Sequence, residues 1–344
     1  MPGLFAWVSK QFGRKSQASS APETRLLNPM NASASGPESL HTDLAEQLEN
    51  HLFSWLLDTT PTALSDPAAG TDPALGLLDQ RLLNGQLEEL PRQPMTLPML
   101  MRALSDDNTG RQTMAEIILQ DPALTDQLLQ MANSPFFRHG DHRIESVDQA
   151  VFLLGMNGIR NVIAAAIMRP MMSARNSREA LFAQRCWRWG LACGKAAELI
   201  ARYRGEDTSA HFLVGLMPAL AYMTLRRELL RITRTAGATT EPEPAVVRVA
   251  IARHQWHLCQ LLAAEWNLPP RYHAMLLAAE RPSPKQTHAP LVDGMVMASR
   301  EVLRVAHQRN LGEEDMARLI QLSPEQISQV RSALKQMLQS GPAS

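Results

Sequence analysis

The sequence predicts an all-α fold, and three observations support this prediction. Apolar residues recur at helical spacing in most segments from residue 44 onward. Prolines, glycines and capping residues separate these segments, as is typical of helix ends. No segment shows the apolar and polar alternation of a strand. With 344 residues, 45% of them apolar and 20% charged, the chain has the composition of a globular protein with one large or two modest domains.

Residues 1–40 are predicted to be a flexible tail, because residues 16–40 are rich in Ser, Ala, Asn and Pro. Within the tail, residues 1–15 could form a short amphipathic helix with Lys10, Arg14 and Lys15 beside its apolar residues. This helix could dock weakly on a membrane surface or a partner, or it could be a frayed terminus. It does not resemble a signal peptide, because no basic residue precedes its apolar residues.

Residues 41–85 are predicted to be a helical lead-in with helices at 44–56 and 75–83. An extended arm follows, because Leu90-Pro91 and Leu97-Pro98 each place a residue before proline outside the helical region. Helices at 98–104 and 113–119 come next.

The best-punctuated segment is residues 118–134. Asp121 is the predicted N-cap, and Pro122 occupies the first helical position, where a missing N–H costs nothing. Leu124 opens a buried apolar stripe. Asn133 and Ser134 close the helix before Pro135.

The remaining predicted helices begin with Ser146, whose capping-box pattern leads into a helix that Gly155 ends. Residues 158–172 are apolar nearly all round and predict a central buried helix. Further helices are predicted at 177–203, 211–230 and 246–266, in a shorter segment ending at residue 279, and at 291–308, 313–322 and 323–338.

Charge and cysteine content suggest a cytoplasmic protein. The 34 basic and 34 acidic residues cancel, so no global field favours nucleic acid or an anionic membrane. Cys186, Cys193 and Cys259 show no pairing pattern and are predicted to be reduced and buried. No membrane span is expected, since the longest apolar run, residues 162–168, is far shorter than about eighteen residues.

Motifs for phosphate loops, nucleophile elbows and zinc-type cysteine pairs are absent. His139 and His142 fall in a loop beside Arg138 and Arg143, which would repel a metal ion. His254 and His257 could share a helix face and bind a metal, but we prefer to interpret them as partly buried, hydrogen-bonded histidines.

Four arginines gather near the end of one predicted helix: Arg226, Arg227, Arg231 and Arg234. The helix dipole alone can explain cations at this position. Phosphate or nucleic-acid contact is the alternative interpretation.

At this point the chain resembles a known family, the HDOD domain, which is the HD-related output domain of bacterial signalling proteins. The resemblance covers residues 86–285 and is strongest between Leu90-Pro91 and Leu154-Gly155, where several short motifs keep their order. The matching motif positions are Asp121, Pro122, Leu124, Asn133, Ser134, Gly155, Gly215, Trp266 and Pro269. The resemblance implies an HD-like helical bundle, with residues 286–344 as C-terminal helices that pack on it.

The departures from the HD pattern concern the metal ligands. Related HD phosphohydrolases bind metal through histidines and a His-Asp pair, because a hydrolytic metal needs several ligands and an open site. Aligned by eye, the ligand positions hold Trp189, Pro218, Ala219, Gln255, Glu280 and Arg281. We therefore expect no metal, no other cofactor and no catalytic residue.

The resulting hypothesis is a non-catalytic signalling or regulatory module that acts by contact with other signalling proteins. One alternative is a degenerate HD-type phosphohydrolase of nucleotides or cyclic dinucleotides, with a site rebuilt from His211, His254, His257 and His273. A second alternative is a regulator that binds nucleotides or nucleic acid through the four arginines, although nucleic acid is not the expected partner.

Overall fold

A computed structural model describes residues 37–339, except 96, 99–100, 102–109, 139–141, 238–240 and 282–288. Throughout the described residues the chain is helical and no strand occurs, which confirms the predicted all-α fold. The predicted helix at residues 1–15, most of the helix at 98–104, and His139 lie outside the described residues.

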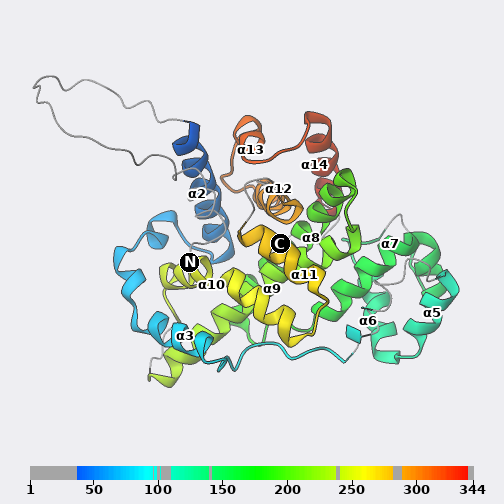
Figure 1. Cartoon of the computed structure of the whole chain (residues 1–344), viewed down its shortest axis with the longest axis horizontal. Coiled ribbons are helices and arrows are strands. Elements are labelled where there is room, and N and C mark those ends of the chain that lie inside the picture. Colours follow the sequence, from blue (N-terminus) through cyan, green and yellow to red (C-terminus); the bar gives the residue numbers. More distant parts are fainter. Residues whose placement is uncertain are drawn as a thin grey trace, which may run out of the picture.

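Two long helices form the centre of the molecule, α8 (Ser177–Arg204) and α9 (Thr208–Thr235), and they pack closely against each other (Figure 1). Their close approach depends on glycine. A Cβ at Gly215 would lie 2.5 Å from the Cα of Gly194. A Cβ at Gly190 would lie 2.7 Å from the Cβ of Ala219. Gly215 of the family motif is therefore a packing residue of this interface.

The other helices surround this pair. On one side lie α5 (Arg111–Leu119), α6 (Pro122–Ala132) and α7 (Val147–Met168), and on the other lie α3 (Pro73–Leu83), α10 (Pro244–Glu265) and α11 (Pro270–Glu280) (Figure 1). At the top of Figure 1, α12 (Pro290–Val305) lies on α8, together with α2 (Pro37–Leu56), α13 (Glu313–Leu319) and α14 (Pro324–Gln339). Two short 3₁₀ helices, Pro61–Leu64 and Pro67–Thr71, connect α2 with α3.

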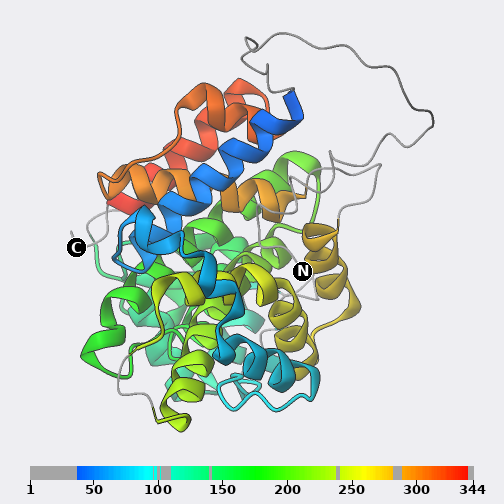
Figure 2. The ribbon, with the colours of Figure 1, turned by 90° about the vertical axis from the view of Figure 1, so that its left-hand side faces the viewer.

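The lead-in and C-terminal helices share the core with the central pair. Figure 2 shows α2 beside the C-terminal helices, and its Leu48, Leu52 and Phe53 are almost completely buried. In α12, a Cβ at Gly294 would lie 2.8 Å from the backbone nitrogen of Ala197 in α8. The segments on either side of the matched region are thus built into the same apolar core.

The arm between α3 and α5 is fixed by two buried side chains. The carboxylate of Glu228, fully buried in α9, accepts hydrogen bonds from Arg81 and from the backbone amides of Glu88 and Glu89. The indole of Trp266 donates to the carbonyl of Pro91 at 3.0 Å. The family tryptophan therefore ties the end of α10 to the Leu-Pro arm.

Local signals explain most helix ends. Asp121 accepts from the amides of Ala123 and Leu124, as its predicted capping role requires. Ser323 and Gln326 cap each other reciprocally at the start of α14. α9 begins earlier than predicted, because Asp207 caps it by accepting from the amide of Ala210.

The regular helix predicted to end at Gly155 is interrupted there. Gly155 has a φ of 66° and a ψ of 178°, a non-helical conformation that separates α7 into two helical segments across a kink, as the two predicted helices on either side require. Ser146 caps α7 as predicted by accepting from the amide of Gln149. The reciprocal bond differs, because Gln149 accepts from the amide of Glu145 rather than from that of Ser146. α7 ends at Met168 rather than 172, because Pro170 cannot supply the next helical amide.

Two described helices, α7 and α9, are long and apolar enough to cross a membrane. Within their most apolar windows, 61% of α7 and 94% of α9 are buried inside the protein. Contact with neighbouring helices accounts for this composition, because a helix that is apolar on all sides is typical of a protein core.

Candidate functional site

Four of the six residues that the resemblance aligns with HD metal ligands lie in or beside one buried cluster of aromatic and polar side chains. Trp189 from α8 stacks on Tyr222 from α9 with ring centroids 4.8 Å apart. Phe53 from α2 stacks on Tyr222 as well, with centroids 5.7 Å apart. The Tyr222 hydroxyl donates to Oε1 of Gln255 in α10 at 3.1 Å. We call Phe53, Trp189, Tyr222 and Gln255 the core cluster.

Pro218 and Ala219 complete the region on α9. Ala219 faces Gly190, the residue after Trp189 in sequence, where α8 and α9 approach each other closely. Its carbonyl also accepts from the thiol of Cys186 at 3.7 Å. Both residues are buried within α9, and neither a proline ring nor a methyl group can bind a cation.

The side chains of the core cluster do not fit a metal ion. The indole of Trp189 donates to Ser299 at 3.0 Å and has no lone pair to offer. Burial raises the pKa of Tyr222 well above its usual range, so the phenol stays neutral and its proton points to Gln255. The Nε2 of Gln255 is buried without a hydrogen-bond partner among the described residues, and an amide N–H₂ is a donor rather than a metal ligand.

Burial also favours the neutral forms of nearby acidic groups. Burial raises the pKa values of the Cys186, Cys193 and Cys259 thiols, and a neutral thiol is a poor metal ligand. The pKa of the Glu49 carboxyl rises to about 7 through burial, which Arg248 opposes. The region therefore favours uncharged groups.

The last two altered positions lie at the end of α11. Arg281 approaches Glu280 at 3.6 Å, and the Arg281 side chain is 61% exposed. The charge of Glu280 adds to the raised pKa of Cys259 in α10, so this carboxylate lies on the α10 side of α11. Glu280 and Arg281 thus form an ion pair with each other at the end of α11.

The histidines of the alternative enzyme reading have different partners. His254 faces Asp79 at 2.7 Å, His211 contacts Glu206 at 3.2 Å, and His273 bonds to Gln260 at 2.9 Å. Across the described part of the chain, no group of three or more His, Cys, Asp or Glu side chains could hold a metal ion.

Three of the four candidate arginines form ion pairs. Arg227 is buried and pairs with Glu179 at 2.6 Å while also donating to two backbone carbonyls. Arg226 pairs with Glu241 at 2.6 Å, and Arg231 pairs with Glu88. Arg234 lines a cavity of about 400 Å³ that Glu89 and Glu179 line as well. Each of the four arginines thus has an acidic side chain paired with it or lining the same cavity.

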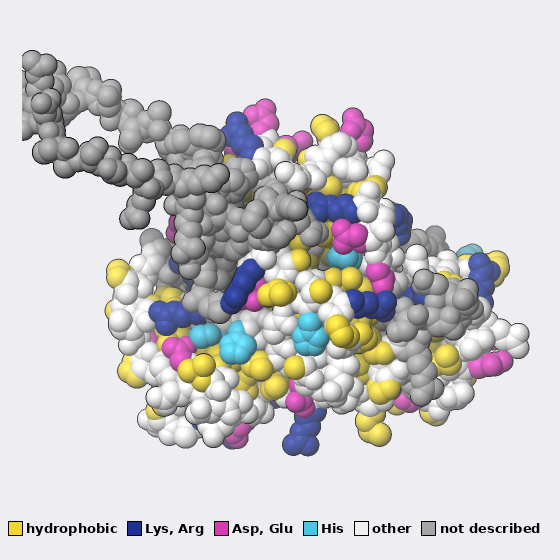
Figure 3. Space-filling model, in the orientation of Figure 1, with side chains coloured by type: hydrophobic (Ala, Val, Ile, Leu, Met, Phe, Trp, Pro, Cys, Tyr) yellow, Lys and Arg dark blue, Asp and Glu magenta, His cyan; other side chains and the backbone are white. Residues whose placement is uncertain are grey.

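The surface shows the same balance of charge. On the face drawn in Figure 3, the described Lys and Arg side chains are interspersed with Asp and Glu. This agrees with the equal numbers of basic and acidic residues in the sequence.

The family motif residues mostly serve the fold. The Nδ2 of Asn133 donates to the carbonyls of Leu129 and Ile144, and its Oδ1 accepts from the amide of Ile144. Asn133 thereby joins the end of α6 to the segment that leads into α7. Pro269 precedes α11 as its N-cap. Ser134 differs, because its hydroxyl contacts only the Met131 sulfur at 3.8 Å and it lines a separate cavity.

Sequence reasoning missed Tyr222, Phe53 and Ser299, the partners of the altered positions. Tyr222 lies three residues after Ala219 on an apolar helix, and its sequence gives no sign of a buried hydroxyl with a polar partner. Phe53 and Ser299 come from helices outside the region of resemblance.

Comparison with known proteins identifies related sequences and folds. The family model described as HDOD domain matches residues 90–282. An uncharacterised protein of Treponema pallidum (strain Nichols) is 21% identical over 225 residues, which cover 63% of this chain and 43% of that protein. The chain thus matches less than half the length of this relative.

Solved structures share the fold at low identity. A Shewanella amazonensis SB2B protein, named as a candidate metal-dependent phosphohydrolase, has a TM-score of 0.56 and 19% identity, covering 79% of this chain and 99% of that one. A candidate signal transduction protein from Marinobacter aquaeolei VT8 has a TM-score of 0.53 and 16% identity, covering 80% of this chain and 65% of that one. An HDOD domain protein of unknown function from Geobacter sulfurreducens has a TM-score of 0.50 and 17% identity, covering 76% of this chain and 99% of that one.

Proposed function

Since the chain belongs to the HDOD domain family, we propose that it is a non-catalytic signalling module that acts through contact with other proteins. The core cluster carries this proposal. Indole, pyrrolidine, methyl and amide groups stand at ligand positions of HD enzymes, and their neighbours Tyr222 and Phe53 pack against them. A hydrolytic metal needs several ligands and an open coordination position.

Contact with a partner is the mode of action that remains for such a domain. Two adjacent side chains on α7 support it, because Phe152 is 70% exposed and Leu153 is 49% exposed. Exposed aromatic residues are enriched at protein interfaces. The guanidinium of Arg111 lies 5.9 Å from the Phe152 ring, which adds a charged group to this surface.

Affinity capture from native lysate tests the proposal. We expect the full chain to retain a specific partner and Phe152→Ser to lose most of it. Leu277→Ser is the control, since Leu277 is also an exposed apolar residue, at 49%, but lies on α11. A variant lacking residues 1–36 tests the predicted docking role of the tail and keeps α2, which contributes Phe53 to the core.

Metal content separates this proposal from the enzyme alternative. Purified protein should contain no stoichiometric Fe, Mn or Zn and should not hydrolyse nucleotides or cyclic dinucleotides when these metals are added. Stoichiometric metal that is lost in a His254→Ala/His257→Ala double variant would overturn the proposal. So would the absence of any specific partner for every variant.

A further inference from the structure

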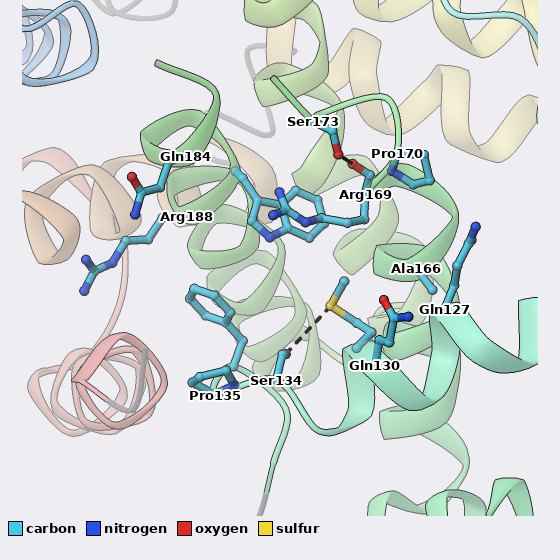
Figure 4. Close-up of a pocket in the computed structure, with 13 residues that line it drawn as sticks. Gln127, Gln130, Ser134, Pro135, Ala166, Arg169, Pro170, Ser173, Gln184 and Arg188 are labelled. Carbon is cyan, nitrogen blue, oxygen red and sulfur yellow. Dashed lines mark hydrogen bonds between the residues drawn. The ribbon is translucent and has the colours of Figure 1, made fainter. Parts of the chain in front are cut away.

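A cavity of about 610 Å³ lies between α6, the end of α7 and α8 (Figure 4). Its volume is within the range of about 300–1,000 Å³ that is usual for small-molecule sites. Gln127 and Gln130 line it from α6, Arg169 from the end of α7, and Trp187 and Arg188 from α8. The core cluster is separate, because none of its members lines this cavity.

The cavity carries positive charge without an acidic partner. Among the described residues that line it, none is Asp or Glu, whereas Arg169 and Arg188 are both present. Arg188 donates through Nη2 to the carbonyl of Leu338 at 2.7 Å, and its Nε is buried without a described partner. An arginine stays ionised under all ordinary conditions, so the site favours an anion.

The second arginine offers a flat surface. The guanidinium of Arg169 lies 5.2 Å from the centre of the Trp187 ring, in a cation–π contact. Burial lowers the pKa values of Arg169 and Arg188, in keeping with two guanidinium groups that have lost part of their hydration. Planar heterocycles stack readily on guanidinium planes.

Amide side chains surround this stack. Figure 4 shows Gln130 on one side of the cavity and Gln184 with Arg188 on the other, while Ser134 lies on the α6 side. Gln130 donates through Nε2 to Oδ2 of Asp126 at 2.8 Å, so its Oε1 is the atom that it offers to a ligand. Gln127 and Gln184 carry both a donor and an acceptor, which is the pairing needed to bind the edge of a nucleic-acid base. The Ser134 hydroxyl has only a thioether contact, so it can turn toward a ligand.

We propose that this cavity binds a mononucleotide, with the base against Arg169 and the glutamine amides and the phosphate at Arg188. Binding here changes no covalent bond and requires no metal. It would give the signalling module a small-molecule input. Nucleotide binding at this cavity does not require a protein partner.

Isothermal titration calorimetry of the full chain tests the site. The probes are the four ribonucleoside monophosphates, the corresponding nucleosides and inorganic phosphate. We expect at least one monophosphate to bind at least tenfold more tightly than its nucleoside and than inorganic phosphate, because only the nucleotide engages both parts of the site. No binding of any monophosphate at millimolar concentration would overturn the proposal, as would equal affinity for inorganic phosphate.

Matched variants locate the site. Arg169→Gln and Arg188→Gln should each weaken binding about tenfold or more, the usual size of a lost charge-assisted contact. Arg202→Gln is the control, since Arg202 lies on α8 and pairs with Glu198 away from this cavity. Arg169 is exposed and its variant should fold, which thermal unfolding will verify. Unchanged affinity in both cavity variants, or an equal loss in Arg202→Gln, would refute the assignment.

Discussion

The hydroxyl of Tyr222 donates a hydrogen bond to Oε1 of Gln255 at 3.1 Å, and both side chains are almost completely buried. This bond joins α9 to α10 across the buried centre of the molecule. Gln255 uses one of its polar atoms here, while its Nε2 has no partner among the described residues. A buried donor without a partner costs about 1–3 kcal/mol, so the cluster is polar without being optimised for stability.

The Tyr222→Phe variant should be less stable than the natural protein by about 1–3 kcal/mol, because Oε1 of Gln255 loses its buried donor. Urea unfolding measures this difference. Tyr203→Phe is the control, since the Tyr203 hydroxyl bonds to the exposed Gln329 and should cost less than about 0.5 kcal/mol. In the double variant Tyr222→Phe/Gln255→Leu, the loss in free energy of unfolding should be smaller than the sum of the losses in the two single variants. A Tyr222→Phe variant of unchanged stability would contradict the buried bond.

The Glu49 carboxyl should make stability depend on pH. Its pKa is about 7 in the folded protein and 4.5 as an ordinary glutamate. The folded state therefore binds more protons than the unfolded state between these values. Stability should decrease as pH rises from about 4.5 to 7, by an amount on the order of 3 kcal/mol.

Thermal unfolding at pH 5 and pH 8 checks this prediction. The Glu49→Gln variant removes the titrating group, so it should lose this part of the pH dependence and be more stable than the natural protein at pH 8. If both proteins lose the same stability between these pH values, another group is responsible.

Asn133 and Ser134 are neighbours in the family motif but should behave differently. Asn133→Ala removes three hydrogen bonds that join α6 to the segment before α7, and it should cost about 2–3 kcal/mol. Ser134→Ala removes only a weak contact to Met131 and should cost less than about 0.5 kcal/mol. Chemical denaturation of both variants measures the difference. Equal costs would mean that Ser134 also serves the fold.

The sequence predicted the fold far better than the sites. Helix caps such as Asp121 act over a few residues, so their signals are local and were read correctly. The contact between Trp189 and Tyr222, and the convergence of Arg169 with Trp187 and Arg188, depend on how separate helices pack. Spacing along one helix does not contain that information. For this reason the cavity could not be predicted from the sequence.

Two glycines in helices should respond to alanine in opposite directions. At Gly215, a Cβ would lie 2.5 Å from the Cα of Gly194 on the facing helix, so Gly215→Ala must separate α8 from α9. Such overpacking costs about 1–3 kcal/mol or more. At Gly76, an exposed position inside α3, a Cβ would meet nothing within 4 Å. Gly76→Ala should stabilise the protein by about 0.5–1 kcal/mol, because alanine favours the helix. Thermal unfolding of both variants tests the pair, and a harmless Gly215→Ala would show that the two central helices can move apart at little cost.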